Sequence, residues 1–266
     1  MFQEKTKILW NELIKPSYYR LGLKCNNNYS FALPGQFIML YIPDDMPSLL
    51  RRPFSIHKIT SSKDKKGDII EILYKVIGKS TQKLSNQKQD MVIDIIAPLG
   101  KGFFLSDSLK RVFIVAGGIG IAPMVFLASF FKEKLNDTSG WKLFLGGKTE
   151  QDLLCEQEFI NLNMPVYKTT EDGSAGQKGF ITQELERQIT VTQPELICAC
   201  GPMGMLKSVS VIAEKYCIPC QVSMETMMAC GMGACLACAV EKKESEKYFH
   251  VCLDGPVFDA ASLTFK

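Results

Sequence analysis

Four cysteines near the end of the chain have the spacing of iron–sulfur ligands. Cys230, Cys235 and Cys238 form a C-x4-C-x2-C motif, and Cys252 follows after thirteen further residues. This order is typical of a [2Fe-2S] cluster held by four thiolates. Glycines and alanines separate the first three cysteines, so the backbone can turn tightly around a compact cluster. The sequence therefore predicts a metal site made of these four residues.

Two other kinds of metal site have to be weighed against a [2Fe-2S] cluster. Zinc is also held by four cysteines, but its ligands usually come as two separated close pairs, whereas three ligands share one loop here. A Rieske centre replaces two of the cysteines with histidines. The two histidines of the chain, His57 and His250, lack that arrangement. We therefore favour the [2Fe-2S] cluster.

Two motifs in the first half of the chain have residues that suit a flavin nucleotide. Arg52 precedes a predicted strand and Ser55 follows three residues later, so a guanidinium can pair with a diphosphate while a hydroxyl faces a flavin ring. Further on, another predicted strand runs through Gly78 into a helix start at Ser80 and Thr81, and helix starts bind phosphate. A solvated strand edge and a helix N-cap are the simpler interpretations of these two motifs.

Two turns that follow buried strands in the second half suit a dinucleotide. The first reads Gly118-x-Gly120-x-x-Pro123, which is not a G-x-G-x-x-G fingerprint but lets a diphosphate approach a helix start. A role in packing alone accounts for this turn equally well. The second, C-G-P at 200–202, lies at the carboxyl edge where open α/β sheets bind ligands. Its simpler interpretation is a tight turn with a buried cysteine.

The residues up to about 101 have the pattern of an antiparallel β-barrel. Short segments rich in β-branched and aromatic residues alternate with turn residues. The predicted strands cover residues 37–42, 53–59, 69–76 and 92–97, and the predicted turns lie at 34–35, 43–45, 63–68 and 98–102. This pattern predicts a small barrel of about six strands.

The following residues alternate between strands and helices. Strands are predicted at 112–116, 142–145, 166–169, 196–199 and 220–223, and helices at 122–134, 151–161, 182–187 and 203–216. Such alternation predicts a parallel sheet with helices on both faces. The uncharged segment 112–131 has the length of a membrane span, but its three glycines and one proline fit a strand, a turn and a helix start better.

Composition indicates a globular chain without a nucleic-acid or membrane partner. The 266 residues are 46% hydrophobic, enough for two ordinary domains and a small third one. A net charge of 31 − 28 = +3 is too small to indicate binding to nucleic acid or to an anionic membrane. The charged N-terminus offers no signal-peptide core. Without such a signal, the ten cysteines suit the reducing cytoplasm. Two of them form a C-x-x-C at 217–220, and we interpret this spacing as chance rather than as a redox dithiol.

Taken in order, these motifs resemble the ferredoxin-reductase superfamily and, more closely, the electron transfer subunits of class 1B dihydroorotate dehydrogenases. The resemblance rests on R-P-F-S, G-x-S-T, G-G-I-G-I-A-P-M, C-G-P-M, the segment 170–182 and a cluster loop followed by C-L-D-G-P-V-F. It implies FAD bound by Arg52, Pro53, Phe54, Ser55, Tyr74, Lys75, Val76, Gly78, Ser80 and Thr81. It implies NAD(H) bound by Gly118, Gly120, Pro123, Cys200, Gly201 and Pro202.

The resemblance also implies a domain order and an activity. The expected domains are a FAD-binding β-barrel at 1–101, an NAD-binding α/β domain at 102–224 and a [2Fe-2S] domain at 225–266. Hydride passes between nicotinamide and FAD, and the cluster carries single electrons, so no catalytic proton donor is expected. In the resembling family the partner is an FMN-containing subunit that oxidises dihydroorotate in pyrimidine biosynthesis, in a heterotetramer with equal numbers of the two chains.

Some residues depart from the superfamily pattern and leave alternatives open. Phe54 stands where much of the superfamily has tyrosine, and Ser80 stands where the family's G-x-G-T has its second glycine. Lys148 and Glu150 give opposite indications for NADPH and NADH. An NAD(P)H:ferredoxin-type flavin and iron–sulfur oxidoreductase subunit shares nearly every motif and is the alternative function.

Overall fold

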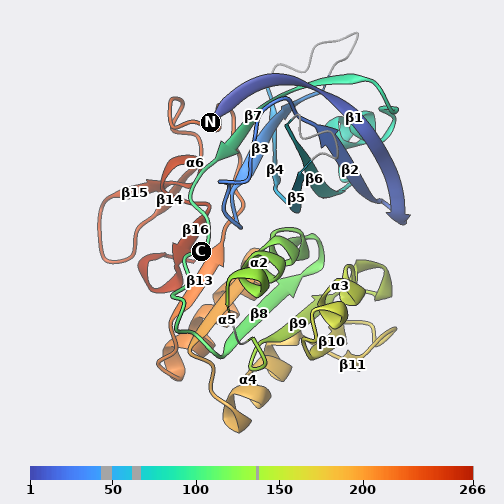
Figure 1. Ribbon diagram of the computed structural model, residues 1–266. Helices are drawn as coiled ribbons and strands as arrows, with labels where there is room; N and C mark the ends of the chain where they lie inside the picture. The colour runs from blue at the N-terminus through green and yellow to red at the C-terminus, as the bar shows by residue number, and fades with distance from the viewer. Residues whose placement is uncertain (43–49, 62–66, 136–137, 266) are drawn as a thin grey trace.

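An antiparallel sheet forms the first part of the molecule (Figure 1). The computed structural model describes residues 1–42, 50–61, 67–135 and 138–265. The turn predicted at 43–45, and most of the one at 63–68, lie outside these ranges. The strands of this sheet are β1 (Phe2–Lys15), β2 (Tyr18–Lys24), β3 (Phe37–Tyr41), β4 (Arg52–Ser55), β5 (Lys58–Ser61), β6 (Asp68–Lys75) and β7 (Val92–Leu99), with helix α1 (Lys79–Ser85) between the last two.

This sheet curls into a half-barrel whose strand order is β4-β3-β7-β1-β2-β6-β5. The prediction of one strand at 53–59 was wrong, because β4 and β5 lie at opposite edges of the sheet. The chain crosses between the edges at Ile56 and His57, whose N–H groups donate to the carbonyls of Gln36 and Glu71. The first bond extends the pairing of β4 with β3 and the second extends that of β5 with β6, so the chain itself connects the two edges at these residues. The described strands of this sheet number seven rather than about six.

The sequence did not reveal β1 and β2. Along β1 only Thr6 and Ile8 are buried, and the rest of the strand is rich in lysine and glutamate. Such a segment lacks the apolar alternation expected of a half-buried strand. It is a strand because it pairs with both β2 and β7, so tertiary pairing decides its conformation.

The second sheet has the predicted parallel α/β form, except that its edge strand β16 (Val257–Asp259) is antiparallel. Its strands are β8 (Val112–Gly117), β9 (Lys142–Gly147), β10 (Val166–Thr170), β11 (Gln177–Lys178), β12 (Leu196–Cys200), β13 (Cys220–Ser223) and β16 (Val257–Asp259), in the order β11-β10-β9-β8-β12-β13-β16. The helices are α2 (Ile121–Lys134), α3 (Glu156–Asn161), α4 (Ile181–Val191) and α5 (Met203–Lys215). Three short 3-10 turns lie at Gly118–Gly120, Glu150–Asp152 and Ala260–Ser262.

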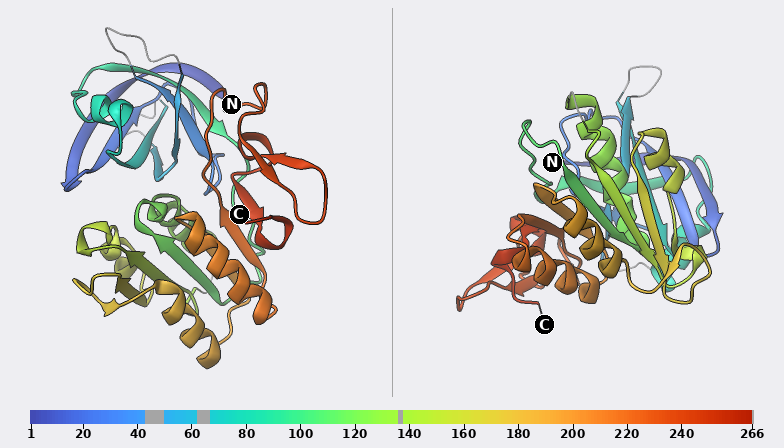
Figure 2. Two further views of the ribbon diagram at one scale, coloured as in Figure 1. Left: turned by 180° about the vertical axis from the view of Figure 1, so that it is seen from behind. Right: turned by 90° about the horizontal axis from the view of Figure 1, so that it is seen from below.

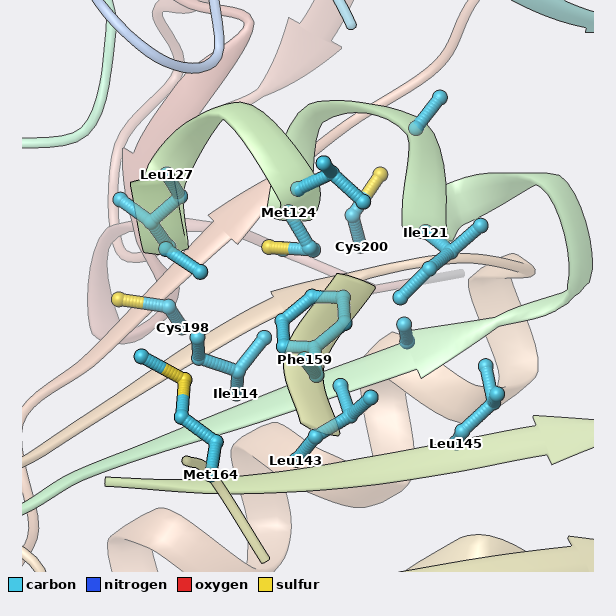
Figure 3. Packing of buried hydrophobic residues seen from close by; sticks show 14 of the residues in the cluster. Ile114, Ile121, Met124, Leu127, Leu143, Leu145, Phe159, Met164, Cys198 and Cys200 are labelled. Carbon is cyan, nitrogen blue, oxygen red and sulfur yellow. The ribbon is translucent and has the colours of Figure 1, made fainter. Parts of the chain in front are cut away.

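Alternate residues of the central strands pack on opposite faces of this sheet. Figure 3 shows Met124 and Leu127 of α2 over Ile114 of β8 and Leu143 of β9. On the other face, residues such as Phe113 pack beneath α4 and α5. Both faces are therefore covered, which explains the continuous apolar runs of these strands. The helix predicted at 151–161 is interrupted before α3, and α4 is longer than predicted.

The C-terminal segment lies beside both sheets (Figure 2). It contains the hairpin of β14 (Ala239–Glu241) and β15 (Tyr248–His250), the one-turn helix α6 (Val251–Asp254) and β16. β16 pairs antiparallel with β13, so this segment supplies the edge strand of the second sheet. No helix among the described residues is long and apolar enough to span a membrane.

A buried histidine links the half-barrel to helix α2. The Nδ1 atom of His57, which is 2% exposed, lies 2.9 Å from the carbonyl oxygen of Ala122 in the first turn of α2. A carbonyl only accepts, so Nδ1 carries the proton of a neutral ring. Burial lowers the pKa of His57 and thereby keeps the ring neutral.

We expect His57 to make the folded protein less stable as the pH falls. An unfolded histidine takes up a proton below its ordinary pKa of 6.5, whereas the buried ring resists protonation. Stability is therefore lost from that pH down to the depressed folded pKa, by up to about 1.4 kcal/mol per pH unit. Thermal unfolding of wild type and His57→Asn between about pH 7.5 and 5 measures this. Equal pH slopes for the two proteins would contradict the expectation.

Candidate functional site

A pocket of about 580 Å³ lies between the half-barrel and the second sheet. Nine residues expected at the FAD site line it: Arg52, Pro53, Phe54, Ser55, Tyr74, Lys75, Gly78, Ser80 and Thr81. The tenth, Val76, packs against the barrel core and donates its N–H to the carbonyl of Ser17 at 2.7 Å. β4, the end of β6 and the start of α1 thus meet around one space.

The two arginines at the start of β4, Arg51 just before it and Arg52 as its first residue, have different surroundings. The Arg51 guanidinium is 2.6 Å from the Asp94 carboxylate and lies over the Tyr41 ring, so it stabilises the barrel. Arg52 lines the pocket, and within the described ranges its guanidinium donates to the carbonyls of the adjacent residues Leu50 and Arg51 alone. Arg52 is therefore the arginine whose charge faces the pocket.

Gly78 leaves space in the wall of this pocket. A Cβ at Gly78 would meet no other atom within 4 Å, and its φ of −167° is open to any residue. Neither folding nor packing therefore requires glycine there, whereas a diphosphate passing close to the backbone would. The Thr81 hydroxyl accepts from the N–H groups of Ile77 and Gly78, so it caps α1, while Ser80 lines the pocket beside it.

One wall of this pocket was not found from the sequence. Its residues end or follow β13, or precede β16: Ser223, Met224, Glu225, Thr226, Met228 and Pro256. They belong to the segment that leads into the cluster loop and to the one that leaves it. This pocket, called the FAD-type pocket below because residues expected at the FAD site line it, is therefore shared by the half-barrel and the C-terminal segment.

A second pocket, of about 680 Å³, lies at the carboxyl ends of the parallel strands. Gly118, Gly120, Gly201 and Pro202, all expected at the NAD site, line it. Two other expected residues lie behind its wall: Pro123 is buried in the first turn of α2, and Cys200 is buried at the end of β12. Burial raises the pKa of the Cys200 thiol, so it is a neutral side chain.

The two interpretations of the first glycine turn apply to different glycines. A Cβ at Gly120 would lie 2.3 Å from the Cys200 carbonyl oxygen, so glycine lets the start of α2 pack against β12. Gly118 has a φ of +52° and open space around its missing Cβ, and it faces the pocket. Gly120 is therefore required by packing, while Gly118 leaves room for a ligand.

Three further residues of this pocket were missed in the sequence. Thr169 is 3% exposed, and its Oγ1 has no hydrogen-bond partner in the described part of the chain. Glu171 and the exposed ring of Phe180 lie on the same side. A hydroxyl, a carboxylate and an aromatic face suit the ribose and the base of an adenosine. The segment 170–182 signalled Glu171 and Phe180, and nothing in the sequence signalled Thr169.

The two pockets meet at residues that line both. These are Lys75 of β6, Ile119 in the turn after β8, and Glu225 after β13. The side chain of Glu225 faces the two pockets, and protein surrounds it on its other sides. The resulting desolvation raises the pKa of its carboxyl. A ring bound in one pocket can therefore reach a ring bound in the other at this junction.

The four cysteines of the motif lie together on the C-terminal segment. The Sγ atoms of Cys238 and Cys252 are 3.3 Å apart, and the N–H of Gly233 points at Cys252 Sγ from 3.1 Å. The N–H groups of Met232 and Cys235 point at Cys230 Sγ, each from 3.4 Å. The loop thus directs backbone donors at sulfur atoms, as a set of bound thiolates requires.

The electrostatics of these thiols differ from one position to the next. Burial opposes ionisation of Cys230, but the backbone N–H donors prevail and lower its pKa to about 6. Burial, with the neighbouring Cys238 thiol, raises the pKa of Cys252 to about 12. Within the described residues, no three histidine, cysteine or carboxylate side chains converge on one point as the ligands of a single ion do. The same residues include ten cysteines, all as free thiols.

Comparison with known proteins distinguishes among the possible functions. Residues 225–264 match the iron–sulfur cluster binding domain of dihydroorotate dehydrogenase B, and residues 114–211 match an oxidoreductase NAD-binding domain. The dihydroorotate dehydrogenase B (NAD+) electron transfer subunit of Caldanaerobacter subterraneus subsp. tengcongensis is 36% identical over 98% of both chains. That of Desulforamulus reducens is 34% identical over 95% of this chain and 94% of its own. The chain belongs to the electron transfer subunits of dihydroorotate dehydrogenase B.

Solved structures share the fold of this electron transfer subunit. A structure of NADH-dependent reduced ferredoxin-NADP oxidoreductase has a TM-score of 0.82 at 26% identity and covers 98% of this chain and 90% of its own. A ferredoxin NADP+ reductase from Neisseria gonorrhoeae with bound FAD and NADP has a TM-score of 0.64 at 17% identity, over 80% of this chain and 91% of its own. The second likeness shows the fold alone.

The cofactors of this subunit follow from the matched domains and the flavin-reductase fold. They are a [2Fe-2S] cluster, FAD and NAD(H). The donors that point at the cysteine sulfurs, and the open space at Gly78 and Gly118, fit these groups. Zinc, the rival interpretation of the cysteine motif, is set aside by the match to an iron–sulfur domain.

Proposed function

We propose that this chain carries electrons from a dihydroorotate-oxidising FMN subunit to NAD+ in the pyrimidine pathway that leads to UMP. The observation that supports this most is the segment at residues 223–228, which begins at the last residue of β13. It lines the FAD-type pocket, its Glu225 also lines the nucleotide pocket, and it runs directly into the cluster loop. Three cofactor sites are thus joined by one short stretch of chain.

We assign FAD to the pocket lined by Arg52, Ser55, Gly78 and Ser80, and NAD(H) to the pocket lined by Gly118, Gly201 and Pro202. The cluster ligands are Cys230, Cys235, Cys238 and Cys252. When bound, nicotinamide and FAD supply two-electron hydride chemistry, and the cluster supplies one-electron transfer. The residues of the chain position these groups and exclude water. The FAD domain is then 1–101, the NAD domain 102–224 and the cluster domain 225–266. Strand β16 of the cluster domain pairs with β13 and so joins the second sheet.

We place the catalytic subunit over the cluster loop. Exposed apolar side chains of this segment are Met227, Met232, Leu236 and Leu253. Apolar side chains left open beside a redox centre are typical of an interface. A heterotetramer with equal numbers of the two chains would cover them. Ten cysteines without a disulfide suit the cytoplasm as its compartment.

The deciding experiment is an assay of the complex. The tagged chain is recovered anaerobically from its own cells together with its partner, and NAD+ reduction is measured after addition of dihydroorotate. We expect the complex to reduce NAD+, and the chain alone not to, because the dihydroorotate site lies on the partner. A complex that holds FAD and cluster but reduces ferredoxin instead of responding to dihydroorotate would support the ferredoxin-linked alternative.

A further inference from the structure

Two side chains of the half-barrel reach into the nucleotide pocket and converge on Asp152. The Lys75 ammonium is 2.9 Å from Asp152 Oδ1, and the buried Tyr18 hydroxyl donates to the same oxygen. Lys75 also lies over the Tyr18 ring, 4.7 Å from its centre. Burial opposes ionisation of Asp152, but the bonds from Tyr18 and Lys75 lower its pKa, so the carboxylate is charged. All three residues line the nucleotide pocket.

Asp152 belongs to the turn that follows β9, at residues 148–153, and it holds that turn in shape. Its second oxygen, Oδ2, accepts from the N–H groups of Lys148 at 3.1 Å and Thr149 at 3.3 Å. The half-barrel holds the turn at another point, because Lys15 Nζ donates to the carbonyls of Glu150 at 2.9 Å and Leu153 at 2.8 Å. The β9 turn is therefore fixed against the half-barrel from both sides of Asp152.

The β9 turn also fixes the loop that follows β10. The Gly147 carbonyl accepts from the N–H of Glu171 at 3.1 Å, and the Lys148 carbonyl accepts from Asp172 at 3.2 Å. The N–H of Glu150 donates to the Ser174 hydroxyl at 2.7 Å. A continuous set of hydrogen bonds thus runs from the half-barrel to Glu171, on the far side of the pocket.

The far side of the pocket is where the adenosine half of a dinucleotide belongs. Hydride transfer requires the nicotinamide to lie against the flavin, which is possible where the pockets meet, at Ile119 and Glu225. The diphosphate of a dinucleotide bound in this way would pass Gly118, and its other end would lie toward Thr169, Glu171 and Phe180, which line the same pocket. The position of those residues determines how well the adenosine half binds.

We propose that Asp152 is a positioning residue of the nucleotide site, through which Tyr18 and Lys75 of the half-barrel hold the turns that bind the adenosine half of NAD(H). This inference rests on the proposed function, since it takes a dinucleotide to be the ligand of the pocket. The Lys75 side chain, expected at the FAD site, then serves the nucleotide site as well. Nucleotide affinity depends on the flavin barrel as well as on the parallel sheet.

The test uses ADP-ribose, which has the adenosine half of the ligand and lacks nicotinamide, and calorimetric titration of the holoprotein. Asp152→Ala removes every bond of the carboxylate, and we expect its Kd for ADP-ribose to rise about tenfold or more. Asp152→Asn keeps an oxygen for the two N–H groups, so it should recover much of that loss. Tyr18→Phe removes a single hydroxyl and should weaken binding by a few-fold.

A kinetic measurement separates positioning from general damage. With ferricyanide as the acceptor, Asp152→Ala should raise the KM for NADH and leave kcat near the wild-type value, because the nicotinamide end of the site is intact. FAD content, iron content and Tm are measured for each variant. The control is Glu186→Gln, which removes an ion pair with Lys215 between α4 and α5, away from both pockets, and should change none of these values.

The outcomes distinguish the two proposals. A wild-type chain that does not bind ADP-ribose would contradict the nucleotide assignment itself. A wild type that binds it, with Asp152→Ala and Tyr18→Phe binding equally well, would overturn the positioning role alone. If Asp152→Ala does not fold, Asp152→Asn and Tyr18→Phe decide: weaker ADP-ribose binding at unchanged FAD content supports the role, and unchanged binding refutes it.

Discussion

Replacing Cys235 with serine is expected to abolish the iron–sulfur cluster while FAD stays bound. Cys235 lies in the exposed loop, and its N–H points at Cys230 Sγ, so the loop converges on the cluster from this side. Serine has the same shape but offers a hard oxygen ligand where iron in these clusters takes soft thiolate. Cys235 does not line the FAD-type pocket, so flavin binding should not depend on it. The expected protein is yellow rather than brown.

The measurement is iron and acid-labile sulfide per chain, with the visible spectrum and the flavin content of the same sample. Cys217→Ser is the matched control, because Cys217 is also exposed but lies at the end of α5, outside the cluster loop. It should keep the full cluster. Full iron, sulfide and visible absorption in Cys235→Ser would overturn the ligand assignment.

Gly78→Val is expected to cost most of the FAD affinity without unfolding the chain. The added Cβ enters open space in the apoprotein, and the residue needs no unusual backbone angle. With FAD bound, the same atoms occupy the volume that the diphosphate needs. Overpacking of this kind costs roughly 1–3 kcal/mol, which is about 5- to 150-fold in Kd. Gly78→Ala adds less volume and should have a smaller effect in the same direction.

The apoprotein provides the control for this series. Its Tm should change little, since loss of a glycine N-cap on a seven-residue helix costs about 1 kcal/mol at most. FAD affinity is then measured by titrating flavin into the apoprotein of wild type and both variants. If the Tm falls in step with FAD affinity, Gly78 is needed for folding, and the cradle assigned to it is wrong.

Local spacing made some of these sites predictable from the sequence. The four cysteines were predictable because three of them lie within one loop, where sequence distance limits spatial distance. The parallel sheet was predictable from continuous apolar strands such as β8. Gly118 and Gly201 were predictable because the turn between a buried parallel strand and the next helix is where open α/β sheets bind ligands.

Residues brought together over long sequence distances were not predictable in this way. Thr169 is an ordinary strand residue until the neighbouring strands make its hydroxyl part of a pocket. Asp152 meets Tyr18 across 134 positions, and neither residue belongs to a motif. The charged segment β1 is a strand because β2 and β7 pair with it, whereas its own sequence pattern does not predict a strand. The tenth expected FAD residue, Val76, lies one position beyond β6 and faces the barrel core.

The antiparallel pairing of β16 with β13 limits how this protein can be divided or recombined. Phe258 lies opposite Val222, and both are buried. A chain cut before β16 would leave β13 as an unpaired apolar edge, the kind of surface that recruits other strands and aggregates. The cluster segment is consequently not an interchangeable module at the end of a reductase. A chimera that exchanges it has to carry a replacement for β16, or a new protection for the edge that β16 covers.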